Sequence, residues 1–211
     1  MLLASLRQIL LAVLFVASPA HAVDWEHIYT QHEVAVSRAS LEGTRLVAFK
    51  GDTVMEAPLA RVLAVILDNE HRTDWVGRLM ESRLLTTDDP FDYVVYQSFG
   101  LPPPFSDRDY VYRGHAERKA TGSVTLHMSS VEHPGAPETI GVRAELVNSR
   151  YELTPLPDGR TRVEVEILTD PKGAMPIWIV NLIQRTWPRD TLTGIREQLG
   201  KPWVRDHPLP P

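Results

Sequence analysis

The feature of this sequence that most restricts its fold is the alternation of apolar and polar residues in its second half. Segments 123–130 and 161–168 alternate throughout, and segment 142–153 alternates in its first half. Successive side chains of a β-strand point to opposite faces, so each segment predicts a strand with one dry face and one wet face. Such strands are typical of an antiparallel sheet, and its dry face must be covered by another part of the chain.

The covering element predicted by the sequence is a helix from Pro176 to about Leu199. Apolar residues recur in this segment close to helical spacing, and proline is well suited to the first turn of a helix. Pro188 lies inside the segment, where it should kink the helix because its ring removes one backbone hydrogen bond. We therefore expect an α+β fold in which a curved antiparallel sheet wraps around one long C-terminal helix.

The first half of the chain supplies further elements. Leu59, Val62, Leu63, Ile66 and Leu67 form an apolar stripe that predicts a helix after Pro58. We also expect a short opening helix over residues 23–31 and a short helix around His71–Met80. Strands are expected at Val34–Arg38, Thr44–Lys50, Phe91–Phe99 and Asp109–His115.

The N-terminus has the layout of a secretory signal peptide. Arg7 precedes the apolar run Ile9–Ala17, which is followed by the small-residue triplet Ala20-His21-Ala22. The run is too short to span a membrane, which takes about 20 apolar residues. We predict cleavage after Ala22 and a periplasmic or secreted location. The predicted organisation is a signal peptide over 1–22, one domain over 23–200 and a proline-rich tail over 201–211.

Several kinds of chemistry are disfavoured by what the sequence contains. The formal net charge of −5 argues against binding to nucleic acid. There is no cysteine, and the histidines lack the spacing of metal ligands. Serine-nucleophile and phosphate-loop motifs are missing, and Glu164 and Glu166 belong to a wet strand face. We expect no metal, no cofactor and no enzymatic activity.

Tyrosines in the middle strands point instead to a binding cavity. Tyr93, Tyr96, Tyr110 and Tyr112 combine an apolar ring with a polar tip. Mostly apolar walls with a few polar groups are typical of small-molecule sites. Side chains that simply fill the core would give the same pattern.

Four stretches of the sequence resemble the START (steroidogenic acute regulatory protein-related lipid transfer) domain family, and most closely its phosphatidylcholine-transfer-like branch. The run Phe105–Tyr112, which reads FSDRDYVY, follows a proline-rich loop as it does in that family. Trp25-Glu26, Trp75 and the segment Asp170–Trp178 with Asn181 match in the same order. The resemblance covers Val23 to Leu199.

The resemblance implies a helix-grip fold with an internal apolar tunnel that carries one phospholipid or sterol-like ligand. The loop Leu101–Phe105 and the C-terminal helix would form the gate of the tunnel. Arg108 and Asp109 would be a structural charged pair at the junction of loop and strand. The residues expected to contact lipid are Tyr96, Phe99, Leu101, Phe105, Tyr110, Tyr112, Leu126, Met128, Ala144, Leu146, Asn148, Val165, Trp178, Asn181, Leu182, Ile183 and Trp187.

Two departures from the family bear on the ligand. Val76 replaces the aspartate that many members carry after the tryptophan. Gly114 replaces a buried arginine of several sterol-type members, which argues against sterol recognition by an internal arginine–carboxylate pair. Arg113 is adjacent but should point to the other face of its strand.

The expected partners are a lipid ligand and, transiently, a membrane surface, and the protein is expected to be a monomer. Basic residues of the last segment (Arg185, Arg189, Arg196, Lys201 and Arg205) suggest docking to anionic lipid, assisted by Trp203. A solvated helix face would give the same charge pattern. A ligand sensor without transfer activity stays an alternative, as does an enzyme for which Tyr96, Tyr110, Tyr112 and Asn148 are the candidate acid–base residues.

Overall fold

The structure, a computed structural model, describes residues 23–41 and 43–211, so the predicted signal peptide lies outside the described residues. The strands are β1 (Glu26–Gln31), β2 (Val34–Ser40), β3 (Val47–Met55), β4 (Leu79–Asp89), β5 (Asp92–Phe99), β6 (Arg108–Arg118), β7 (Val124–Ser130), β8 (Val142–Arg143), β9 (Glu145–Leu146), β10 (Ser149–Pro155), β11 (Thr161–Ile167) and β12 (Thr169–Asp170). The helices are α1 (Leu59–Leu67), the 3₁₀ turn η1 (Arg72–Asp74) and α2 (Ile177–Gln198).

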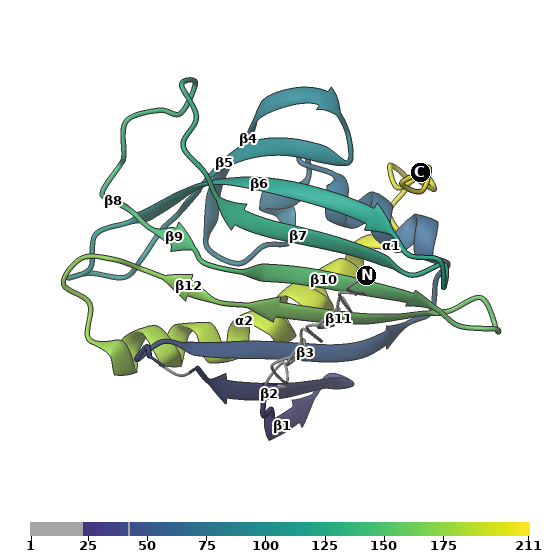
Figure 1. Cartoon of the computed structure of the whole chain (residues 1–211), viewed down its shortest axis with the longest axis horizontal. Coiled ribbons are helices and arrows are strands. Elements are labelled where there is room, and N and C mark those ends of the chain that lie inside the picture. The colour runs from purple at the N-terminus through teal and green to yellow at the C-terminus, as the bar shows by residue number, and fades with distance from the viewer. Residues whose placement is uncertain (1–22, 42) are drawn as a thin grey trace, which may run out of the picture.

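One large sheet wraps along α2, which confirms the predicted α+β helix-grip architecture (Figure 1). Its strand order is β1-β2-β3-β11-β10-β7-β6-β5-β4, and all of these neighbours are antiparallel. β8 adds a short parallel pairing to β6, and β9 pairs with β12 in a small separate ladder. In Figure 1, α2 runs behind β10 and β11, and α1 lies beyond its C-terminal half.

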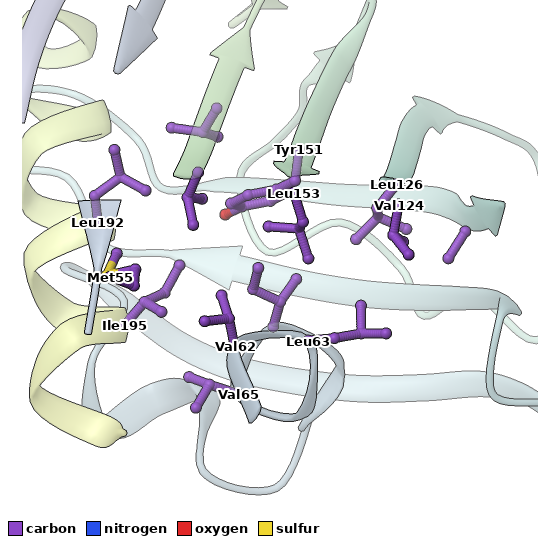
Figure 2. Packing of buried hydrophobic residues seen from close by; sticks show 14 of the residues in the cluster. Met55, Val62, Leu63, Val65, Val124, Leu126, Tyr151, Leu153, Leu192 and Ile195 are labelled. Atoms are coloured by element: carbon purple, nitrogen blue, oxygen red, sulfur yellow. The ribbon is translucent and has the colours of Figure 1, made fainter. Parts of the chain in front are cut away.

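The hydrophobic core fills the end of the interior that lies between α1 and the C-terminal half of α2. Figure 2 shows Leu192 and Ile195 of α2 facing Val62 of α1, with Leu153 and Leu126 of the sheet alongside. These side chains are almost completely buried. The predicted alternation of β11 is confirmed, since Val163 and Val165 are buried, whereas Arg162, Glu164 and Glu166 are at least partly exposed.

α2 lies very close to β3 because of a glycine. A Cβ atom on Gly51 would stand 2.8 Å from Pro188 Cβ and 2.9 Å from Leu192 Cδ1. Pro188 does not end the helix, which continues through it to Gln198. The absence of a side chain at Gly51 is therefore what lets this part of the helix rest on the sheet.

The prediction of an opening helix was wrong, because residues 26–31 form β1. His32 and Glu33 both have positive φ angles, 51° and 61°, and they join β1 to β2 in a tight hairpin. Two consecutive left-handed residues are typical of a hairpin turn whose twist suits the flanking strands. Pairing with β2 thus overrides the helical spacing of Trp25, Ile28 and Tyr29.

The sequence reading also missed β4 and overestimated the helix before it. Only Arg72–Asp74 forms a helical turn, and Leu79 already begins β4. β4 is an edge strand with several register irregularities and mostly exposed side chains, so it lacks the alternation that reveals a half-buried strand. The strand expected over 142–153 is divided into β8, β9 and β10.

The last eleven residues pack against the body of the domain. Val204 is fully buried, and the His207 backbone N–H donates to the Ala60 carbonyl oxygen at 3.0 Å. Trp203 is half-buried and stacks on His71 with ring centroids 4.1 Å apart, so its ring packs against the domain. Within residues 23–41 and 43–211, no helix is long and apolar enough to span a membrane.

Candidate functional site

A cavity of about 160 Å³ lies between the sheet and the N-terminal half of α2. Its described lining residues are Arg72, Trp75, Val76, Gly77, Arg78, Gln97, Phe99, Leu101, Arg108, Tyr110, Tyr112, Met128, Leu146, Ser149, Tyr151, Ile167, Thr169, Pro171, Met175, Val180, Ile183, Gln184 and Trp187. Most of this surface is apolar. The core occupies one end of the space enclosed by sheet and helix, and the cavity occupies the other.

About half of the residues expected to contact lipid line this cavity. They are Phe99, Leu101, Tyr110, Tyr112, Met128, Leu146, Ile183 and Trp187. Tyr110 and Tyr112 are two apart on β6, so strand alternation brings both to the inner face. On α2, the residues that face the cavity are Val180, Ile183, Gln184 and Trp187, spaced as one helix face.

Other residues expected to contact lipid do not line this cavity. Tyr96 is only 1% exposed, but it is three residues from Phe99 on β5 and therefore points to the opposite face. There the guanidinium groups of Arg83 and Arg143 cover its ring. Leu126 and Val165 belong to the core, Ala144 is buried outside the cavity, Asn148 is exposed, and Phe105 does not reach the lining.

Three expected residues of α2 face away from the cavity. Trp178 is 66% exposed and Leu182 is 59% exposed. They lie with Asn181 and Arg185 in a shallow groove between α2 and the strands β1–β3. Because the cavity takes the helix face that contains Val180 and Ile183, the face containing Trp178 and Leu182 is left to the outside.

The sequence reading missed Arg72, a buried arginine of the cavity wall. It is 8% exposed and lies in η1, where its Nε donates to the Asp68 carbonyl oxygen at 3.4 Å. Nη1 donates to the Tyr112 hydroxyl at 3.4 Å, and Nη2 donates to the Ile66 carbonyl oxygen. The one available signal was its spacing of three from Trp75, which places the two side chains together on a helical turn.

Tyrosine hydroxyls surround the Arg72 guanidinium. Tyr93, Tyr112 and Tyr151 all lie close enough to interact with its charge. Burial raises the pKa of Tyr112 and of Tyr151 well above the usual value, although Arg72 partly opposes the shift. Burial likewise raises the pKa of Tyr110 to about 12. All of these hydroxyls are therefore neutral at physiological pH, while the guanidinium keeps its charge.

Arg108 and Asp109 do not pair with each other, so the expected charged pair was wrong. Neighbours on a strand point to opposite faces, and each residue has partners of its own. Arg108 donates to backbone carbonyl oxygens, among them those of Pro171 at 2.7 Å and Lys172 at 3.2 Å. Asp109 pairs with Arg143 and accepts the Ile140 N–H at 3.0 Å. Arg108 thus ties the start of β6 to the loop that leads into α2.

The position of Gly114 is filled by a neighbouring ring. A Cβ atom there would lie 2.5 Å from Tyr93 Cζ, which leaves no room for any side chain. Arg113 points outward, as predicted from strand alternation, and its Nε donates to Asp92 at 2.6 Å. Among the described residues that line the cavity there is no carboxylate, and thus no internal arginine–carboxylate pair.

Comparison with known proteins gives consistent matches over most of the chain. The START domain family model matches residues 10–189. An uncharacterized protein of Pseudomonas aeruginosa is 29% identical over 191 residues, which are 90% of this chain and 94% of that protein. Bovine phosphatidylcholine transfer protein is 28% identical over 163 residues, covering 74% of this chain and 75% of the relative.

Solved structures agree with these sequence matches. A STAR-related lipid transfer protein from Xanthomonas axonopodis has a TM-score of 0.75 and 25% identity, covering 84% of this chain and 99% of that one. The human StarD13 lipid transfer and protein localization domain has a TM-score of 0.73 at 23% identity, covering 86% of this chain and 91% of that chain. The latter supports the fold alone.

Proposed function

Because this chain belongs to the START domain family, whose proteins bind and transfer lipids, we propose that it carries one amphiphilic lipid in the cavity beside α2. The observation that carries this proposal is the cavity itself. Its walls are mostly apolar, and Arg72 and tyrosine hydroxyls form one polar end. Such walls suit an acyl chain, and the polar end suits a head group.

Burial in the cavity must replace burial in a membrane. Moving an acyl chain of about 16 methylenes into water costs on the order of 13 kcal/mol, at ~0.8 kcal/mol per CH₂. The present cavity, about 160 Å³, is smaller than typical ligand pockets of roughly 300–1,000 Å³. A long-chain lipid therefore fits only after the cavity widens.

We place the widening at the loop Leu101–Phe105 and the N-terminal half of α2. Leu101 of this loop, Met175 just before α2 and Ile183 in the N-terminal half of α2 all line the cavity. The C-terminal half of α2 is held in the core by Leu192 and Ile195. Outward movement of the first turns of α2 would therefore open the cavity without breaking the core.

The outward face of those same turns is the proposed membrane contact. Trp178 and Leu182 are exposed large apolar residues on successive turns, and Arg185 follows them. Tryptophan favours the membrane interface, and arginine interacts with anionic head groups. Arg189 and Arg196 were also expected to dock. In the structure, Arg189 donates to the Gln31 side chain, and Arg196 donates to the Thr53 hydroxyl and the His32 carbonyl oxygen.

We further propose that the protein acts outside the cytoplasm as a monomer without catalytic activity. The N-terminal sequence supports export, as argued from its layout. Tyr96 faces away from the cavity and Asn148 is exposed, so neither is placed as an acid or base. The raised pKa values of Tyr110 and Tyr112 keep both hydroxyls protonated, which does not suit a general base at neutral pH.

Transfer of lipid between vesicles tests the proposal. Donor vesicles contain a mixture of fluorescent phospholipids and acceptor vesicles contain none, and the measured quantity is the rate at which label appears in acceptors. A rate that rises in proportion to protein concentration is expected. Stoichiometric binding without transfer would make the protein a sensor, and the absence of binding to any lipid would overturn the proposal. Mass spectrometry of lipids recovered after incubation reveals any chemical change.

A further inference from the structure

We propose that Met80 and Met175 are an oxidation-sensitive pair at the gate, and that a peroxide slows the loading of lipid by converting them to methionine sulfoxide. The gate is the loop Leu101–Phe105 together with the first turns of α2. The pair is a modification site, and its effect on loading rests on the proposed function. The exposure of the methionines, their positions and the chemistry of sulfur support the pair.

The methionines of the described residues fall into two classes of exposure. Met55 is completely buried in the core, and Met128 is 6% exposed. Met80 is 50% exposed, and Met175 is partly exposed. The sequence has no cysteine, so no thiol of the chain competes for a peroxide. Because oxidation of a sulfur atom follows its exposure to solvent, Met80 and Met175 should react first.

Met80 lies at the base of the gate loop. In the pairing of β4 with β5, β4 has one residue more than its partner between Leu79 and Glu81, so Met80 is the extra residue of a β-bulge. A bulge turns a side chain away from the regular alternation of the strand. A Cβ atom on Gly100 would lie 3.3 Å from Met80 Sδ, so the sulfur is next to the residue that precedes Leu101. An oxygen atom added to this sulfur would therefore stand at the start of the gate loop.

Met175 lies on the other side of the gate. It is located just before α2, and it lines the cavity together with Leu101 of the loop and Ile183 of the helix. The unbranched, flexible side chain of methionine suits a surface that must adapt to an apolar ligand. An acyl chain that enters between the loop and the helix would pass this side chain.

Oxidation makes this passage polar and leaves the chain intact. The O–O bond of the peroxide breaks and one oxygen atom is transferred to the sulfur, which loses two electrons and becomes a sulfoxide, while the peroxide is reduced to water or an alcohol. Both C–S bonds remain. The sulfoxide oxygen accepts hydrogen bonds from water, and an acyl chain that passes it must displace that water. Loading should therefore become slower while the fold is retained.

The order in which the methionines react is the first measurement. Lipid-free protein is incubated with hydrogen peroxide and digested after different times, and mass spectrometry measures the gain of one oxygen atom at each methionine. Met80 and Met175 should react more than about tenfold faster than Met55 and Met128, whose sulfur atoms are reached only when the structure opens. Denaturant midpoints before and after treatment measure whether the fold is retained.

Transfer of fluorescent phospholipid between vesicles measures the consequence, after catalase has removed the peroxide. With Met80 and Met175 oxidised, the transfer rate should fall about tenfold, the change that ~1.4 kcal/mol of additional barrier produces. Treatment with a methionine sulfoxide reductase should restore the rate, because it returns the thioether.

Leucine variants assign the loss to these two sulfur atoms. Leucine is close to methionine in volume and cannot form a sulfoxide. Each variant is compared with itself before and after peroxide, so differences in basal rate cancel. Met80→Leu with Met175→Leu should keep its rate after peroxide, and each single variant should lose less than the unaltered protein. Met55→Leu removes a core sulfur instead and should lose as much as the unaltered protein does.

The outcomes separate this inference from the proposed function. Oxidation of Met55 or Met128 before the gate methionines would overturn the inference while lipid carriage stands. An unchanged transfer rate after oxidation of Met80 and Met175, a loss that persists in the double leucine variant, or a loss that coincides with unfolding would also overturn it. If the untreated protein binds no lipid, the proposed function fails, and the effect on loading fails with it.

Discussion

At the scale of single residues, His71 connects the C-terminal segment to the loop that carries Arg72. Its Nδ1 lies 2.9 Å from Asp68 Oδ2, and its ring stacks on Trp203. The hydrogen bond to Asp68 raises the pKa of His71 above its usual value, and burial opposes this shift. The protonated ring is therefore the form that the folded protein favours.

We predict that His71→Gln lowers stability more at mildly acidic pH than at alkaline pH. A histidine whose pKa is raised by folding stabilises the folded state below its unfolded pKa of about 6.5, and this contribution is lost as the pH rises through the folded pKa. Denaturant midpoints of both proteins at several pH values measure the difference. His27→Gln changes an exposed histidine that has no ion pair in the described residues and serves as the control. A destabilisation that is independent of pH would contradict the prediction.

A second residue-scale prediction concerns Gly51. Gly51→Ala would place a Cβ atom 2.8 Å from Pro188 Cβ, so α2 or β3 must shift. Overpacking of this kind costs about 1–3 kcal/mol of unfolding free energy. Gly200→Ala is the control, since a methyl group at Gly200 would meet nothing within 4 Å and the φ angle there suits alanine. Chemical denaturation measures both, and equal stability of the two variants would show that the contact is not tight.

At the scale of elements, α2 has two faces with different surroundings. Val180, Ile183 and Trp187 face the cavity, whereas Trp178 and Leu182 face outward. We predict that Trp178→Ser with Leu182→Ser weakens vesicle binding, because about 1.5–3 kcal/mol is gained for each large apolar side chain that becomes buried. Ile140→Ser removes a similarly exposed apolar residue elsewhere and should have little effect. Vesicle flotation measures binding, and unchanged flotation of the double variant would exclude this face.

The second prediction at this scale concerns the gate formed by the loop Leu101–Phe105 and α2. The chain has no cysteine, so Leu101→Cys with Ile183→Cys introduces a unique pair on the two sides of the cavity. We expect a short, cleavable thiol crosslinker to slow transfer strongly, because the cavity must widen to accept a chain. Cleavage of the linker should restore the rate. Full transfer activity in the crosslinked protein would rule out this gate.

At the scale of the whole molecule, the position of the cavity follows from how the core is distributed. α1, the C-terminal half of α2 and the facing strands pack fully at one end (Figure 2). The other end is bounded by loops and by the first turns of α2. We infer that the packed end holds the sheet in shape, and that a ligand would enter at the end that contains the cavity.

Export is the prediction that belongs to the whole chain. Expression of the full sequence in a bacterial host should yield a protein that begins at Val23, because cleavage is expected after Ala22. The mass of the purified protein and its partition between periplasmic and cytoplasmic fractions measure this. Retention of residues 1–22 in the mature protein would contradict the prediction.

Local patterns in the sequence were sufficient to predict the class of fold and the approximate place of the site. Alternation identified β7 and β11, and helical periodicity identified α1 and α2, since each of these elements has one buried face. The run Phe105–Tyr112, together with the segment Asp170–Trp178, indicated the family by resemblance. Such features can be read locally because burial of one face imposes a period on the residues.

The set of residues that meet in the cavity depends instead on tertiary packing. Edge strands β1 and β4 carry little periodic signal, because exposed faces impose none. Trp178 and Trp187 belong to one apolar-rich helix, yet they end on opposite sides, and Arg72 is buried although arginine is normally exposed. The positions of these side chains depend on how segments far apart in the chain pack against one another, and a local sequence pattern contains no information on that packing.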